Sequence, residues 1–137
     1  PARSRQHATP YFDRLLSSAS PRYDVVVVAL GTNSLGQSTL EAGYARMIRE
    51  AIAAGARCVW VGPPDVRKAN LKARLPGFYR DLNALAARSC EVIDSREFTR
   101  YPSQGGDGYH YNFPGGPEAA ERWAHGVSAR IARSPLH

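Results

Sequence analysis

The run Val25–Leu30 constrains the fold of this chain more than any other segment, because all six of its residues are apolar. A strand with one face in water alternates apolar and polar residues, whereas a strand of a parallel sheet covered by helices on both faces is apolar throughout. A membrane-spanning helix needs about 20 apolar residues, far more than this run supplies. The run therefore predicts a buried strand of an α/β protein and no membrane span.

Strands and helices alternate along the predicted chain. The expected elements are strands at 25–30, 58–62 and 91–94, and helices at 10–16, from the capping box 38–41 to Gly55, at 78–87 and from Pro117 onward. This alternation predicts an α/β fold in which a parallel sheet lies between helices, with the three strands in sequence order. The 137 residues, of which 43% are hydrophobic, are enough for one domain and too few for two.

Two cysteines, Cys58 and Cys90, lack the close spacing of zinc or thioredoxin-like sites. Each lies four residues before the end of a predicted strand, so their sulfurs would approach each other if the strands are parallel neighbours. A disulfide would indicate a periplasmic or secreted protein. Two separate buried thiols, the interpretation preferred from the sequence, would instead fit the cytoplasm.

The net charge of +6 raises the question of nucleic-acid binding. The 18 lysines and arginines are scattered along the chain, however, and no zinc-finger, RNA-recognition or helix-turn-helix pattern accompanies them. We therefore expect no nucleic-acid partner. A solvated basic surface is the simplest interpretation, and a weak attraction to anionic glycans or cell-wall polymers is the functional one.

Gly31-Thr32-Asn33 follows the apolar run directly. Ligands of open parallel sheets bind beyond the carboxyl ends of the strands, so this turn lies where a site is expected. Gly31 permits a tight exit from the strand, and the side-chain amide of Asn33 can donate a hydrogen bond to an oxyanion. An ordinary turn, in which Gly and Asn are both common, is the competing interpretation.

A second motif, Asp107-Gly-Tyr-His110, lies in a loop ahead of the last predicted helix. A tight turn can bring the Asp107 carboxylate to Nδ1 of His110 and leave Nε2 free to act as a base; polar surface residues are the competing interpretation. Tyr109 and Tyr111 flank the histidine and are candidates for the wall of a substrate pocket, although they can equally pack the loop onto the domain. Asp65, which follows the second strand, is a further pocket candidate, although a solvated loop is the simpler account.

Gly31-x-Asn33 and Asp107-x-x-His110 resemble the third and fifth sequence blocks of the SGNH (GDSL-type) hydrolases, and together they span most of the chain. The resemblance implies a flavodoxin-like three-layer α/β/α sandwich and ester hydrolysis through an acyl-enzyme, with no metal or cofactor. It also implies that His110 is the base, that Asp107 orients it and that Asn33 binds the oxyanion. Ser34 departs from the pattern, because many members have Asp after the third-block Asn, and the second-block glycine is absent from the first residues of the chain.

The first SGNH block, a Gly-Asp-Ser after an opening strand, does not occur in this sequence. Ser34 follows the wrong strand and Ser4 has no strand before it, so neither is nominated and the nucleophile is unknown. The apolar run 25–30 also lacks a preceding strand, and such an edge invites aggregation. We therefore expect residues 1–137 to be the C-terminal portion of a single SGNH-like domain whose first strand is missing. An upstream fragment, a second copy or the folded-back N-terminal residues would cover 25–30.

The resemblance implies a serine-type esterase that removes a small acyl group, such as O-acetyl, from a glycan or cell-wall polymer. A non-catalytic SGNH-like domain that binds a saccharide or a partner protein is the alternative, because the sequence contains no evident nucleophile.

Overall fold

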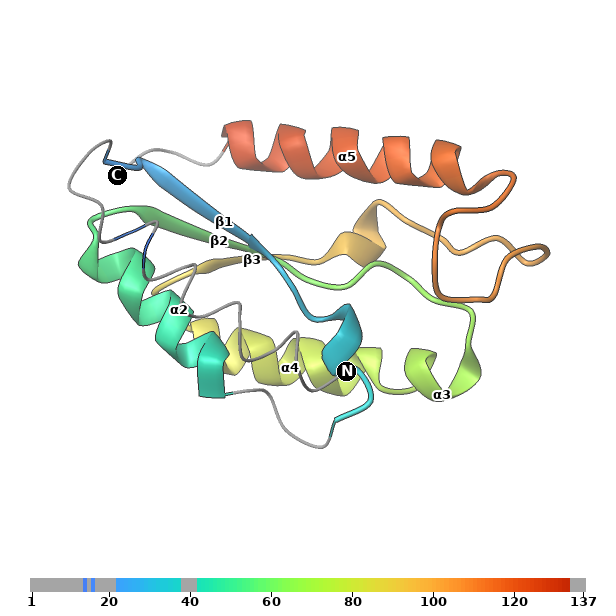
Figure 1. The fold of residues 1–137 in the computed structure, drawn as a ribbon, viewed down its shortest axis with the longest axis horizontal. Helices are drawn as coiled ribbons and strands as arrows, with labels where there is room; N and C mark the ends of the chain where they lie inside the picture. Colours follow the sequence, from blue (N-terminus) through green and yellow to red (C-terminus); the bar gives the residue numbers. More distant parts are fainter. Residues whose placement is uncertain (1–13, 15, 17–21, 38–41, 134–137) are drawn as a thin grey trace.

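Alternating apolar strands and amphipathic helices build a three-layer α/β/α sandwich in the computed structural model, which describes residues 14, 16, 22–37 and 42–133 (Figure 1). Its elements are β1 (Val25–Ala29), the 3-10 turn η1 (Thr32–Ser34), α2 (Ala42–Ala53), β2 (Arg57–Val61), α3 (Ala69–Lys72), α4 (Leu75–Ala86), β3 (Glu91–Ile93), the 3-10 turn η2 (Ser95–Glu97) and α5 (Gly116–Arg133). The capping box 38–41, and the helix expected over 10–16 except for positions 14 and 16, fall outside the described residues. The short helix α3 was not expected, and α4 begins at Leu75 rather than at 78 because Pro76 is tolerated in a first helical turn.

The three strands are parallel and lie in sequence order, β1-β2-β3. Val25 pairs with Arg57 at the start of β1, and Val59 pairs with Glu91 at the start of β3. The predicted parallel sheet and its strand order are therefore confirmed. Because the strands run the same way, the segments that follow them gather at one edge of the sheet, on the right of Figure 1. We call this edge the carboxyl edge.

The lower face of the sheet in Figure 1 packs against α2 and α4, and this contact forms the larger part of the core. Val28 of β1 and Trp60 of β2 meet Tyr44 of α2 and Leu82 of α4 in one buried cluster. The Trp60 indole N–H also donates to the carbonyl oxygen of Leu30 at 3.0 Å. The end of β1, from which the first motif emerges, is therefore fixed to β2.

On the upper face, α5 leaves part of β1 uncovered. Val127 of α5 packs with Val59, Val61 and Ile93 of β2 and β3. Val27 of β1, by contrast, is 47% exposed. Among the residues described, β1 also has a strand neighbour on one side only. The side of β1 away from β2, which we call the open edge of β1, is therefore an unpaired strand edge beside an apolar surface.

Cys58 of β2 and Cys90, which precedes β3, form a disulfide with their Cα atoms 4.6 Å apart. The strand register explains the contact, because Val59 pairs with Glu91 and the two cysteines each lie one position earlier. Both cysteines are buried. The interpretation preferred from the sequence, two separate thiols, is therefore wrong.

Replacing both Cys58 and Cys90 with alanine should lower the free energy of unfolding by about 3–4 kcal/mol, because the disulfide spans a sequence separation of 32 and restricts the unfolded chain. Urea unfolding of the oxidised wild type and of the double variant measures the difference. Adding a reducing agent should shift the wild type towards the variant and leave the variant unchanged. Equal unfolding midpoints for the oxidised wild type and the variant would contradict this account.

Candidate functional site

The turn after β1 brings Asn33 to the carboxyl edge. Gly31 has a φ of +138°, and a Cβ atom there would lie 2.5 Å from the ring of Phe78, so only glycine fits this exit. The backbone N–H of Ser34 donates to the Gly31 carbonyl oxygen at 2.9 Å and closes the short 3-10 turn. Asn33 lies exposed on this turn. The sequence expectation of a tight glycine exit is thus confirmed.

Asp107 and His110 make the contact that their spacing predicts. Oδ2 of Asp107 lies 2.6 Å from Nδ1 of His110. Oδ1 of Asp107 accepts the backbone N–H groups of His110 and Tyr109 at 2.8 and 2.9 Å. The backbone N–H of His110, then its ring, and then the backbone N–H of Tyr109 hold the pKa of the Asp107 carboxyl well below its ordinary value.

The ionised state of Asp107 decides which nitrogen of His110 carries the proton. A carboxylate only accepts hydrogen bonds, so Nδ1 must be the protonated nitrogen, and the lone pair of the neutral ring is then on Nε2. The side chains of His110 and Asp107 are 61% and 55% exposed. The pair is therefore open to a group that approaches it and can accept a proton from that group.

Tyr109 joins the two motifs. Its hydroxyl donates to Oδ1 of Asn33 at 2.8 Å, across a separation of 76 residues. Its ring also lies edge-on to the ring of His110, with the centroids 4.4 Å apart. The candidate oxyanion donor and the candidate base are therefore both in contact with one tyrosine.

Residues 98–115, which we call the Asp–His loop, are held by the segment that follows β2. The Arg67 guanidinium donates to three carbonyl groups of the loop, those of Pro102, Gly105 and Gly106, at 3.0, 2.8 and 3.2 Å. The backbone N–H groups of Arg67 and Lys68 both donate to the carbonyl oxygen of Gly108, at 2.8 and 3.0 Å. Arg67 therefore fixes the loop on both sides of Asp107.

Asp65 is buried, with 6% of its surface exposed, so the interpretation of this position as part of a solvated loop is wrong. Its Oδ2 accepts the backbone N–H of Tyr101 at 2.8 Å, and its Oδ1 lies 3.4 Å from Nζ of Lys72. The Asp65 carbonyl oxygen accepts the Tyr111 hydroxyl at 2.6 Å. Burial raises the pKa of Tyr111 to about 12, so this hydroxyl keeps the proton that it donates. Asp65 thus supports the Asp–His loop from beneath.

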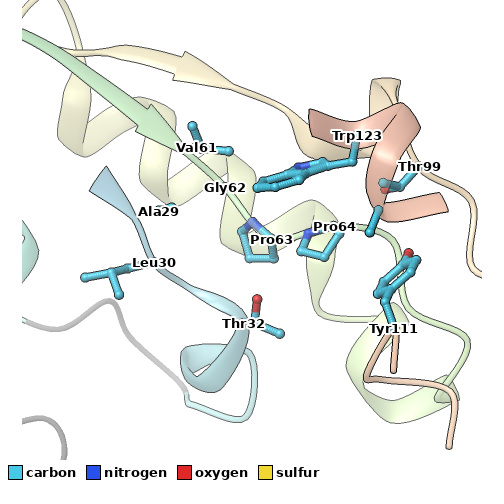
Figure 2. A pocket seen from close by; sticks show the side chains of 11 residues that line it. Ala29, Leu30, Thr32, Val61, Gly62, Pro63, Pro64, Thr99, Tyr111 and Trp123 are labelled. Atoms are coloured by element: carbon cyan, nitrogen blue, oxygen red, sulfur yellow. The ribbon is translucent and has the colours of Figure 1, made fainter. Parts of the chain in front are cut away.

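A mainly apolar cavity of about 320 Å³ lies beside the end of β1, under the first turns of α5. Its lining residues include Leu30, Pro63, Pro64, Tyr111 and Trp123 (Figure 2). Figure 2 shows the Trp123 indole above Pro63, with Thr32 and Tyr111 on the opposite side of the cavity. Of the three predicted pocket residues, Tyr111 lines this cavity, whereas Tyr109 and Asp65 are not among its lining residues.

Two serines near the carboxyl edge are buried and hydrogen-bonded. The Ser34 hydroxyl lies 2.7 Å from the Tyr44 hydroxyl. The Ser95 hydroxyl donates to a backbone carbonyl at 2.6 Å and accepts the indole N–H of Trp123 at 2.8 Å. A nucleophile must be accessible beside its base, so neither serine is placed to attack a substrate. Ser4 lies outside the described residues.

Metal ligands do not gather in the described part of the chain. Within residues 22–37 and 42–133, no three His, Cys, Asp or Glu side chains form a group that could hold a metal ion. None of the helices described there is both long and apolar enough to cross a membrane.

Comparison with known proteins found no relative of this chain: no protein-family model, no curated protein and no solved structure matches it.

Arg67→Met should loosen the Asp–His loop and leave the sheet intact, because the variant loses the three donated bonds but keeps an apolar side chain. The backbone amide of Gly108, which donates to the Tyr101 hydroxyl at 3.0 Å, should exchange with deuterium about 10–100-fold faster. Amides of β2 should keep their protection. Lys68→Met, which removes a cation from the exposed neighbouring position, is the control. An unchanged Gly108 exchange rate in Arg67→Met would show that the contact does not hold the loop.

Proposed function

We propose that this chain is the C-terminal portion of an SGNH-type serine esterase, with His110 as the base, Asp107 as the acid that orients it and Asn33 as the oxyanion donor. One observation carries the proposal: two motifs far apart in the sequence meet, since Tyr109 bonds the Asn33 side chain while the adjacent His110 bonds Asp107. If the turn at Asn33 served only to reverse the chain, its side chain would need no hydrogen bond from a distant tyrosine.

The proposed reaction begins when Nε2 of His110 takes the proton of a serine hydroxyl. The serine oxygen forms a bond to the ester carbonyl carbon, and the π electron pair moves to the carbonyl oxygen, which accepts a hydrogen bond from the Asn33 amide. As the carbonyl reforms, the bond to the alcohol oxygen breaks and this oxygen takes the proton from His110. Water then attacks the acyl-enzyme in the same way, which releases the acid and restores the serine. These steps require no cofactor.

The nucleophilic serine is proposed to follow a strand that pairs with the open edge of β1. Two observations support this position: Val27 is exposed, and among the described residues β1 has a strand neighbour on one side only. A parallel strand added there would end beside Gly31 and Asn33, because parallel strands finish at the same edge of a sheet. An upstream segment of the same protein is the proposed source. A second copy of the chain is the competing occupant, since either would cover the apolar surface.

The proposed substrate is a small acyl ester, such as an O-acetyl group on a glycan or cell-wall polymer. The exposure of His110 and Asp107 supports a large alcohol portion, because an open site admits a polymer that continues past it. The net charge of +6 supports attraction to an anionic polymer. The Cys58–Cys90 disulfide supports a periplasmic or secreted location.

A non-catalytic domain that binds a saccharide or a partner protein is the second candidate. The buried and bonded state of Ser34 and Ser95 favours it, because the base then has neither of these two serines to activate. The cavity lined by Tyr111 and Trp123 offers the aromatic surface that binding sites commonly use. This candidate predicts saccharide binding without release of an acyl group.

In the protein that includes the upstream segment, His110→Ala should lower the turnover of p-nitrophenyl acetate by about 10³-fold or more, because the attacking oxygen loses its base. His125→Ala, which changes an exposed histidine of α5, is the control and should retain wild-type turnover. Full activity of His110→Ala would remove this residue from the mechanism.

The same assay on residues 1–137 alone locates the nucleophile. This chain should be a poor esterase, and adding the upstream segment as a separate fragment should raise its activity. Strong activity of the isolated chain would mean that one of its own serines is the nucleophile. Acyl release by neither preparation, together with saccharide binding, would favour the non-catalytic alternative.

The dependence of kcat/KM on pH should show one protonation on the acid side. The pKa of Asp107 is lowered in the folded protein, so this carboxylate stays charged down to and below its ordinary value of about 4. Catalysis by a single base requires one deprotonation, and Asp107 adds no second one above about pH 4. The logarithm of kcat/KM should therefore rise with a slope of one, and a slope of two would contradict the assigned roles.

A further inference from the structure

Tyr109 does not line the cavity, and its hydroxyl instead contacts the side chain of Asn33. Its hydroxyl donates to Oδ1 of Asn33 at 2.8 Å. We propose that Tyr109 is a positioning residue that orients the Asn33 carboxamide, so that the amide group rather than the carbonyl oxygen faces the developing oxyanion. This inference rests on the proposed function, because the oxyanion belongs to the proposed ester hydrolysis.

The need for a positioning residue follows from the chemistry of the carboxamide. It carries an acceptor oxygen and a donor nitrogen on one planar carbon, and rotation about χ2 exchanges their places. The nitrogen in the oxyanion position stabilises the negative charge, whereas the oxygen in that position repels it. Asn33 is exposed, so water competes for both groups. A donor that holds Oδ1 on one side fixes Nδ2 on the other.

Tyr109 is itself held in place. Its backbone N–H donates to Oδ1 of Asp107 at 2.9 Å, and its ring packs against the main core cluster. The preceding carbonyl group, that of Gly108, accepts two backbone bonds from the segment after β2. Burial, and then the charge of Asp107, raise the pKa of the Tyr109 phenol, so the hydroxyl keeps its proton at neutral pH and acts as a donor.

Asp107 thereby organises two groups at once. Its Oδ2 holds the His110 ring, while its Oδ1 holds the backbone of Tyr109, whose side chain reaches Asn33. A short stretch of the Asp–His loop therefore sets both the base and the oxyanion donor. A two-stage acyl transfer requires the base and the oxyanion donor to keep a constant relative position.

Steady-state kinetics in the protein that includes the upstream segment test the role. Tyr109→Phe keeps the ring and removes the donor, and kcat should fall roughly 10–100-fold with KM changed less than about twofold. The loss should disappear when Asn33 is already Ala, because the positioned group is then absent. Tyr44→Phe is the matched control: it removes the phenol bonded to Ser34 in the same turn and should leave kcat within about threefold. An unchanged kcat in Tyr109→Phe, or an equal loss in the Asn33→Ala background, would overturn the proposal.

A second measurement does not depend on esterase activity. The chain contains four asparagines, at 33, 70, 83 and 112, so ¹⁵N-asparagine labelling gives a simple spectrum of side-chain amides. In Tyr109→Phe the order parameter of the Asn33 amide should fall below about 0.6. The Asn83 amide, which donates to the Tyr79 carbonyl oxygen at 2.7 Å, is the internal control and should not change. If the wild type lacks activity, the proposed esterase function fails, and this spectrum still decides the positioning role. An Asn33 amide equally rigid in both proteins would overturn it.

Discussion

Arg67 holds the Asp–His loop, and the geometry of the candidate site depends on that contact. The loop contains no helix or strand, so no regular hydrogen-bond ladder positions it. Its carbonyl groups instead accept bonds from one guanidinium group, whose donors lie in a rigid plane and suit several acceptors at once. Asp65 holds the start of the same loop through the Tyr101 amide. Because Arg67 and Asp65 both follow β2, the loop is attached to the central strand of the described sheet.

The sheet and the Asp107–His110 contact were predictable because each depends on a local pattern. The run Val25–Leu30 is apolar at every position, and an acid three residues before a histidine can reach it within one turn. The role of Arg67 was not predictable, because its partners are backbone carbonyls 35–39 residues away, and every residue has such a group. The burial of Asp65 depends on the same docked loop. The disulfide needed the register of β2 and β3, which spacing alone leaves open.

The open edge of β1 and the site are structurally linked. The cavity beside the end of β1 includes Leu30 from that end and Trp123 from α5, and Tyr111 of the Asp–His loop lines it as well. A segment that paired with β1 would therefore also border this cavity and approach the loop. In the proposed esterase, one added strand would then both cover the exposed Val27 and supply the nucleophile.

The Asp107–His110 pair and Asn33 are held in place in different ways. The Asp107–His110 pair is more than half exposed, so the attraction between the two groups alone would be weak in water. Its geometry comes instead from local backbone bonds, since the N–H groups of Tyr109 and His110 both bind Oδ1 of Asp107. The contact of the Asn33 side chain with the Tyr109 hydroxyl, by contrast, is long-range and joins residues 76 positions apart. Loosening the loop should therefore separate Asn33 from His110 before it disturbs the Asp107–His110 contact itself. Excluding water from above the pair would strengthen both contacts, because charges and dipoles interact more strongly at low dielectric.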